Sequence, residues 1–352
     1  MSPKKLHEVE ILSGLIASCA KEHSIRSVID LGAGQGYLSR VLAFQHHLCV
    51  LGVDSNTIQT CGAQTTQKRT EKLFVNKSNN FQLQHITHHI TASTLPTLLK
   101  EHFPRRSKRR SQWRWTLCGL HACGDLTSNM IKLYLESSAT CLFSVGCCYH
   151  CMTERFDRNG NVVISDGTHG FPLSAVFNRH KAHLGEHAKM TACQSPERWI
   201  KYQKETEDAI HGHYFRALLH KLMVERGLYP GPPAVAPVLG RMGKHRLKGF
   251  PHYLATAIQR FRLPTDVIKP EEAQAAYEQF LEKDLYRIGI LWALRTMLGP
   301  LFEGMILLDR AVYLHENVVG DGTGPQKGSV QLIPGFDVVE SPRNMILIAL
   351  KD

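Results

Sequence analysis

The first 150 residues of the chain alternate between short apolar runs and longer amphipathic stretches. A short apolar run between turn signals indicates a buried strand, whereas apolar positions at helical spacing indicate a helix. Strands that alternate with helices predict an α/β fold with a mostly parallel sheet. The expected strands are Val28–Leu31, Leu48–Asp54, Phe81–Ile86, Trp115–Leu120 and Cys141–Val145. We therefore predict a Rossmann-like, doubly wound sheet in this part of the chain.

Amphipathic stretches before and between these runs predict the covering helices. Apolar residues at helical spacing between Lys4 and Glu22 predict an N-terminal helix that packs on the sheet. Further helices are expected at about 37–45, 55–77 and 94–102. Asp125 is placed to cap the helix after the fourth strand, because Asp is a preferred N-cap residue.

The alternating pattern is lost from Cys151 to about Lys269. Within this segment a helical stretch begins near Ser195 and runs through Arg226. An insertion directly after the fifth strand predicts either a substrate-binding cap or an inert elaboration. The expected division is therefore a core at 1–150, a mostly helical insertion at 151–269 and a return to the core at 270–352.

The C-terminal part predicts two helices and a final pair of strands. Pro270–Leu298 favours a helix, and Gly299–Pro300 is a C-terminal stop signal, so a second helix is expected at Leu301–Glu316. The apolar runs at 330–333 and 345–350 predict a closing antiparallel pair. This pair would complete a seven-stranded, mostly parallel sheet.

A glycine-rich turn joins the first strand to the next helix, in the order Asp30-Leu31-Gly32-Ala33-Gly34-Gln35-Gly36-Tyr37-Leu38. Glycines let the backbone approach a ligand closely. The dinucleotide pattern G-x-G-x-x-G requires glycine where Tyr37 stands. The carboxylate of Asp30 would also repel a pyrophosphate at the helix N-terminus. An acid here suits a cationic ligand with an ammonium and a sulfonium, so the turn predicts S-adenosylmethionine (SAM) as cofactor.

A second acid supports this interpretation. Asp54 ends the second strand, near the spacing at which an acid accepts the two hydroxyls of a ribose. The alternative is a Rossmann-like sheet whose acids only cap loops. The predicted cofactor-binding residues are Lys5, His7, Asp30, Gly32, Gly34, Gln35, Gly36, Tyr37, Leu38, Asp54, Ser55, Leu120 and His121.

Two polar clusters follow the fourth and fifth strands. Because ligands of open parallel sheets bind beyond the carboxyl ends of the strands, both clusters should meet the glycine turn at one crevice. The predicted catalytic residues are His121, Asp125, Cys147, Cys148 and Tyr149. His121 is the best placed to remove a proton from a hydroxyl or imidazole acceptor. Alternatively, its imidazole is bonded to the backbone or contacts the adenine.

The polar start of the N-terminal helix is a further candidate part of the site. Lys5, His7 and Glu8 stand at the end of the helix expected to lie near the ligand-binding edge. A lysine suits the methionine carboxylate as a point charge, and a His–Glu pair could set the tautomer of an imidazole. The alternative is a solvated first turn.

Cysteines and histidines in the two clusters raise the question of a metal. Both clusters follow strands expected to be buried, where cysteine is common as a small apolar residue. We therefore predict no metal site.

Composition limits the function only weakly. The chain has 352 residues, of which 43% are hydrophobic, and no apolar run approaches the roughly 20 residues of a membrane span. Ten cysteines in a chain of this size fit a reduced, intracellular setting, cytoplasmic or nuclear, and nothing indicates secretion. The net charge of +11 is compatible with RNA as a partner. The residues expected to hold its phosphates are Arg105, Arg106, Lys108, Arg109 and Arg110.

The chain resembles the methyltransferase-like-25 family over nearly its whole length. The motifs that carry the resemblance are Ser2-Pro3-Lys4-Lys5, His7-Glu8-Val9, Asp30 to Ser39, Gly119 to Leu126, Ser144 to Tyr149, Pro172-Leu173-Ser174, Leu307 to Arg310 and Ser341 to Asn344. The resemblance implies a class I methyltransferase fold and SAM as cofactor. His150 lies outside the family pattern. The His-x-Cys-Gly and Cys-Cys pieces are also similar to those of transfer-RNA ribose 2′-O-methyltransferases, which favours RNA.

Two classes of function remain open from the sequence. The first is a SAM-dependent methyltransferase acting on an RNA ribose hydroxyl or base, or on a protein side chain. Base-amino methyltransferases usually carry [Asn/Asp]-Pro-Pro-[Tyr/Phe] after the fourth strand, where this chain has Leu120-His121-Ala122-Cys123. The second class is a catalytically silent relative that keeps the fold as a binding module.

Overall fold

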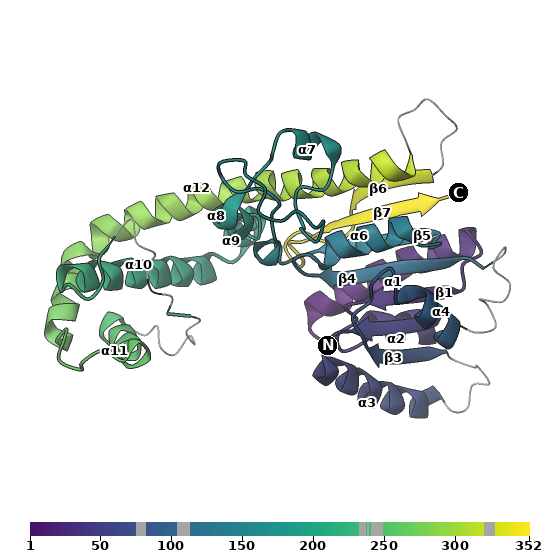
Figure 1. Cartoon of the computed structure of the whole chain (residues 1–352). Helices are drawn as coiled ribbons and strands as arrows, with labels where there is room; N and C mark the ends of the chain where they lie inside the picture. The colour runs from purple at the N-terminus through teal and green to yellow at the C-terminus, as the bar shows by residue number, and fades with distance from the viewer. Residues whose placement is uncertain (75–81, 104–112, 232–236, 238, 241–248, 320–327) are drawn as a thin grey trace. The chain divides into compact units, whose positions relative to one another are not determined.

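The computed structural model describes residues 1–74, 82–103, 113–231, 237, 239–240, 249–319 and 328–352. These residues include one seven-stranded sheet in the order β3-β2-β1-β4-β5-β7-β6 (Figure 1). The strands are β1 Ser27–Leu31, β2 Cys49–Asp54, β3 Leu83–Thr87, β4 Trp115–Ala122, β5 Cys141–Gly146, β6 Gly328–Pro334 and β7 Met345–Lys351. Strands β1 to β5 run parallel, and β7 is antiparallel to both β5 and β6. The predicted mostly parallel sheet with its closing antiparallel pair is confirmed.

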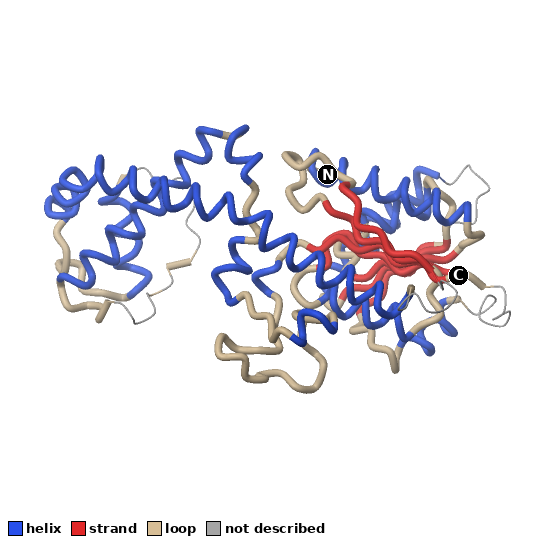
Figure 2. Tube along the Cα trace, turned by 90° about the horizontal axis from the view of Figure 1, so that it is seen from above, coloured by secondary structure: helices blue, strands red, loops and turns tan. Residues whose placement is uncertain are grey.

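Each face of the sheet is covered by helices because successive strand residues point to opposite sides. Val28 packs in one hydrophobic cluster with helices α1 (Pro3–Glu22) and α2 (Tyr37–Phe44). Its neighbour Ile29 packs in the other cluster, with α4 (Leu95–His102), α6 (Leu126–Glu136) and the C-terminal end of α12 (Pro270–Val318). Figure 2 shows helices on both sides of the sheet.

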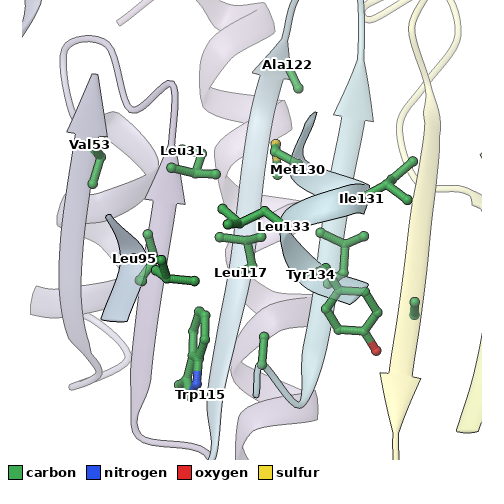
Figure 3. Packing of buried hydrophobic residues seen from close by; sticks show 14 of the residues in the cluster. Leu31, Val53, Leu95, Trp115, Leu117, Ala122, Met130, Ile131, Leu133 and Tyr134 are labelled. Atoms are coloured by element: carbon green, nitrogen blue, oxygen red, sulfur yellow. The ribbon is translucent and has the colours of Figure 1, made fainter. Parts of the chain in front are cut away.

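Packing in the cluster that contains Ile29 places the first turn of α6 next to the glycine turn. Figure 3 shows Met130, Leu133 and Tyr134 of α6 beside Leu117 of β4. Positions three and four apart lie on one helix face, so this face is buried, and each large apolar side chain contributes about 1.5–3 kcal/mol. The first turn of α6 then reaches the glycine turn. A Cβ at Gly32 would lie only 2.9 Å from a methyl carbon of Leu126.

The chain forms two compact units, with bounds that differ from the predicted ones. Residues 1–195 and 298–352 make the first unit, and 196–297 make the second. Residues 151–195 belong to the sheet unit because buried groups tie them to it. For example, the Asp309 carboxylate accepts hydrogen bonds from the backbone N–H groups of Leu173 and Ser174, at 2.8 and 2.9 Å.

The remaining described helices divide between the two units. In the sheet unit they are α3 Thr57–Phe74, η2 Tyr149–Cys151, α7 Ala175–Arg179 and α8 Gly185–Thr191. In the second unit they are α9 Pro196–Lys201, α10 Gln203–Glu225, α11 Phe250–Phe261 and the first part of α12. The second unit has its own hydrophobic cluster, which includes Phe215, Phe250 and Tyr253.

Helix α12 corrects one prediction. The stop expected at Gly299–Pro300 is wrong, because α12 continues through Pro300 as one helix of 49 residues. An interior proline removes one helical hydrogen bond and costs about 3 kcal/mol, so packing must compensate. Gly299 packs closely here: a Cβ on it would lie 3.0 Å from the carbonyl oxygen of Thr191. The close approach of α12 to this carbonyl therefore outweighs the local stop signal.

Helix α12 is also an exception to the expectation that no segment resembles a membrane span. Among the described helices it alone is long and apolar enough to cross a membrane, with a window of mean hydropathy 1.4. Only 22% of that window is buried. A single helix that meets a test of length and composition is weak evidence for a membrane.

Candidate active site

The glycine turn after β1 combines close packing with open space. Gly36 has a φ of 66° and lies against the imidazole of His85, so a Cβ on it would sit 2.4 Å from the ring. Gly34 has a φ of 54°, but the nearest atom to an added Cβ is 3.9 Å away. The left-handed backbone favours glycine at both positions. Gly36 is thus required by the protein's own packing, whereas Gly34 leaves room that a ligand can occupy.

The two acids differ in their surroundings. Asp30 is only 2% exposed and accepts a hydrogen bond from Ser39 Oγ at 2.5 Å. Burial raises the pKa of its carboxyl to about 7, although the bonds from Ser39 act in the opposite direction. Asp54 accepts hydrogen bonds from the backbone N–H groups of Gly34, at 2.9 Å, and Asn56, at 2.8 Å. A cationic ligand beside Asp30 would favour its ionised form, as expected for the ammonium of SAM.

Two cavities of about 250 and 240 Å³ lie at the carboxyl ends of β1, β2 and β4 and share Gly32, Asp54 and His121 in their walls. Of the predicted cofactor residues, all in described parts of the chain, only Gly36 and His7 line neither cavity. The predicted residues in the walls are Lys5, Asp30, Gly32, Gly34, Gln35, Tyr37, Leu38, Asp54, Ser55, Leu120 and His121. The donors, acceptors and open backbone here fit SAM, with Asp30 and Lys5 in one cavity and Ser55 in the other.

A third cavity, of about 510 Å³, lies elsewhere. Its lining includes Trp113 and Ser138, which stand just before β4 and β5. It is therefore at the amino ends of these strands, and parallel sheets bind their ligands at the carboxyl ends. We assign it no part in the active site.

His121 is paired with a buried carboxylate from α1. Its Nε2 lies 3.1 Å from Oε2 of Glu8, which is 1% exposed. Ser341 Oγ donates to the other oxygen of Glu8 at 2.6 Å. Burial alone raises the pKa of Glu8, but hydrogen bonds from His121 and Ser341 outweigh it and leave the pKa below its usual value. An ionised Glu8 favours the tautomer with the proton on Nε2, which leaves the lone pair of His121 on Nδ1.

Of the residues at the start of α1, one lines the cavity and another contacts a distant part of the chain. Lys5 lines the cavity, with its Nζ 5.1 Å from the centre of the Tyr37 ring. His7 instead accepts a hydrogen bond from the backbone N–H of Asp337 at 3.0 Å and lies outside the cavity. The pairing of Glu8 with His121, rather than with the nearby His7, could not be read from the sequence.

Two predicted catalytic residues have structural contacts instead. The expected cap by Asp125 is wrong: its backbone is already helical, its side chain makes no capping bond, and its carboxylate accepts from the N–H and hydroxyl of Thr153 at 2.9 and 2.8 Å. Tyr149 is 2% exposed and donates its hydroxyl to Glu303 at 2.9 Å. Burial, then the charge of Glu303, raises its pKa well above the usual value. Neither residue lines the two cavities.

The last two predicted catalytic residues, Cys147 and Cys148, lie next to a third cysteine, Cys123. Cys123 Sγ lies 2.9 Å from Cys147 Sγ and 3.3 Å from Cys148 Sγ, and the last two are 3.6 Å apart. The contact with Cys147 lowers the pKa of Cys123 to about 5 and raises that of Cys147. The sequence placed these residues on two loops at one edge of the sheet but did not predict that their sulfur atoms would meet.

Two residues around the site were not among the predicted site residues. His85 fills the space between Gly36 and Gly52, and burial lowers its pKa to about 4, so it is neutral. Ser341 orients Glu8 from the far end of the chain. Its motif was noticed, but its contact depends on tertiary structure. The predicted RNA-binding run at 105–110 lies outside the described residues.

Residues 4–155 match a family model described as a methyltransferase domain. The whole chain aligns with probable methyltransferase-like protein 25 from Mus musculus and from Homo sapiens, each at 23% identity and over 75% of the relative. Among solved structures, the plantazolicin methyltransferase BamL in complex with SAH shows 15% identity and a TM-score of 0.27, over 46% of this chain and 52% of that one. Coclaurine N-methyltransferase bound to N-methylheliamine and SAH shows 14% identity and a TM-score of 0.26, over 96% and 71%.

The strand order, the acidic glycine turn and the matched methyltransferase domain define the class of the protein. The chain is a class I SAM-dependent methyltransferase. Its similarity along the whole chain to methyltransferase-like protein 25 confirms the family resemblance drawn from its motifs.

Proposed function

We propose that this enzyme transfers the methyl group of SAM to a ribose hydroxyl of RNA, with His121 as general base. The observation that carries the proposal is the Glu8–His121 pair. His121 lines both cavities, and its side chain is 37% exposed, so it can reach a substrate. Glu8 is buried and fixed by Ser341. A base exposed to substrate and held by a buried acid is the arrangement that proton removal requires.

When bound, SAM supplies an electrophilic methyl group on a sulfonium. Asp30, Gly34 and Asp54 would hold the cofactor, and Lys5 would meet its carboxylate. His121 Nδ1 accepts the proton that the acceptor hydroxyl loses, while Glu8 stabilises the resulting imidazolium through Nε2. General base catalysis of this kind contributes about 10²–10⁴ in rate.

The choice of a hydroxyl rests on the residues beside β4. A base-amino acceptor is usually held by an Asn/Asp-Pro-Pro motif, and Leu120-His121-Ala122 occupies that place. An amine also needs a base less than a hydroxyl does, because it already carries a lone pair. RNA is supported by the net charge of +11 and by the basic run at 105–110.

The test uses the purified chain with isotopically labelled SAM and total RNA or total protein from cells in which its gene is disrupted. We expect label in RNA, released as 2′-O-methyl nucleosides after digestion and detected by mass spectrometry. A Gly34→Arg protein, which should not bind SAM, controls for contaminating methyltransferases. Label confined to protein, or to base amino groups of RNA, would overturn the proposal for the acceptor and leave SAM dependence intact.

A further inference from the structure

Three thiols meet beside the active site. Cys123 follows β4, and Cys147 and Cys148 follow β5, and their sulfur atoms all lie within 4.8 Å of one another. We propose that these three thiolates bind one Zn²⁺ ion and leave its fourth coordination position open. Thiolates are the ligands that zinc prefers, and three protein ligands with one open position are typical of reactive rather than structural sites.

The spacing of the sulfur atoms fits a zinc site with little movement. Zn–S bonds of about 2.3 Å in a tetrahedral site place the ligand sulfurs about 3.8 Å apart. The observed separations are 2.9, 3.3 and 3.6 Å. Binding therefore requires only a small outward rotation of Cys123, whose side chain is exposed.

The backbone already holds the two loops together. Gly124 N–H donates to the carbonyl oxygen of Cys148 at 3.2 Å. Gly124 also has a φ of 54°, and a Cβ on it would lie 2.8 Å from the carbonyl oxygen of Cys151. The loops are thus in close contact through the main chain, so the ligands are preorganised rather than gathered by the ion.

A buried cation next to the thiols supports an anionic group there. Arg310 is 1% exposed, and its Nη1 lies 2.7 Å from the position of a Cβ on Gly146, the residue before Cys147. Among the described residues, Nε and Nη1 of Arg310 have no hydrogen-bond partner. The adjacent Asp309 carboxylate accepts from Leu173 and Ser174. Three thiolates with Zn²⁺ carry one net negative charge, which would offset the buried guanidinium.

A disulfide is the competing occupant of this cluster. It would join two of the sulfurs and leave the third without a role, although Cys148 Sγ is close to both others. A metal ion uses all three. The competition can be decided by experiment because a disulfide excludes thiolate binding of zinc at the same residues.

The test measures zinc in the full-length chain, produced with added Zn²⁺, freed of any affinity tag and dialysed. Elemental analysis should give about one zinc per chain. Cys123→Ser should lower the affinity for Zn²⁺ at least about 100-fold, measured in competition with a chromophoric chelator. This loss is larger than the one expected when a residue that only hydrogen-bonds to a metal ligand is removed. Cys61→Ser, which removes an exposed cysteine on α3, should leave stoichiometry and affinity unchanged.

A second measurement keeps the result independent of folding and of methyl transfer. Replacing Zn²⁺ with Co²⁺ should give thiolate charge-transfer absorption, lost in Cys148→Ser and kept in Cys61→Ser, with all three proteins showing cooperative thermal unfolding. Absence of stoichiometric zinc in the reduced wild-type protein would overturn the proposal. So would a Cys123–Cys147 disulfide found by peptide mapping in protein purified without reductant.

Discussion

The loops after β1 and after β4 border the same crevice but are built in different ways. In the β1 loop, the glycines at 32, 34 and 36 act largely through backbone conformation, and the carboxylate of Asp30 belongs to the same short stretch. In the β4 loop, His121 depends on Glu8 from α1, and Glu8 depends on Ser341 near the C-terminus. The first loop is therefore encoded locally, and the second is assembled by the fold.

This difference suggests a division of labour. We propose that the β1 loop, together with Asp54, binds the cofactor. The β4 loop, with Glu8 behind it, would then bind the acceptor and remove its proton. Variants in one loop should therefore alter SAM affinity, and variants in the other should alter transfer alone.

The largest effect is expected from removing the second unit, which we propose selects the acceptor. Deleting 196–297 and joining Ser195 to Leu298 by a short linker is feasible because a Cβ on Gly299 would lie only 3.2 Å from Gln194 O. Methyl transfer should be lost, whereas SAM affinity, measured by calorimetry, should stay within about twofold, since distant changes act independently. Loss of SAM binding in a folded deletion protein would place part of the cofactor site in the second unit.

Gly34→Arg should come next, because it fills the space left open for the ligand. We expect SAM affinity to fall at least about 100-fold, a change of about 2.7 kcal/mol. Gly167→Arg is a matched control, since Gly167 has a φ of 79° and no atom within 4 Å of an added Cβ, so it tests backbone strain alone. Unchanged SAM affinity in a folded Gly34→Arg protein would exclude the glycine turn from the cofactor site.

Asp54→Ala should weaken SAM binding by about 1–3 kcal/mol, or about 5- to 150-fold, because ribose hydroxyls would lose their acceptor. Part of this effect comes from the N–H of Gly34, which loses its own partner. Asp157→Ala serves as control, because Asp157 also accepts backbone hydrogen bonds but belongs to a turn far along the chain. Unchanged SAM affinity in a folded Asp54→Ala protein would exclude this role of Asp54, and equal affinities for SAM and NAD in the wild-type protein would overturn SAM as the cofactor.

The smallest effect is a pH dependence set by Asp30. The pKa of the Asp30 carboxyl is near its ordinary value of 3.8 in the unfolded chain and about 7 in the folded protein. The folded state thus holds the extra proton, and stability without ligand should fall as pH rises from about 4 through about 7. SAM binding, which favours the ionised form, should tighten about tenfold between about pH 6 and pH 8, with proton release.

Calorimetry in buffers of different ionisation enthalpy measures that proton release. Asp30→Asn should abolish the pH dependence of SAM affinity while keeping the hydrogen bond to Ser39. If the wild-type protein bound SAM equally well across this range, Asp30 would not face the cationic end of the ligand.

The sequence predicted the sheet and SAM as the cofactor because both depend on short-range patterns. The apolar runs marked every strand in the sheet, and the acidic glycine turn marked SAM. It failed at Pro300, where packing at Gly299 overrides a local stop signal. The prediction also failed at Asp125, because its carboxylate accepts hydrogen bonds from Thr153 and does not cap the helix that follows.

The residues near the proposed acceptor site were predicted only in part, because their contacts join elements that are far apart in the sequence. His121 was predicted from topology to lie at the crevice, and it lines both cavities. The partner of His121 lies on another helix, and the three thiols come from two loops, so no spacing along the chain reveals either contact. Contacts of this kind follow from packing of whole elements, not from local patterns.

The measurement that tests the division between the two loops most directly compares SAM affinity with single-turnover transfer in His121→Ala. We predict SAM affinity within about threefold of wild type and transfer reduced at least about 100-fold, the range of a lost general base. Glu8→Gln should show the same separation with a smaller loss, and His150→Ala, which removes an exposed histidine of η2, should change neither quantity. An equal loss of SAM affinity and transfer in His121→Ala, or an unchanged rate, would contradict the account.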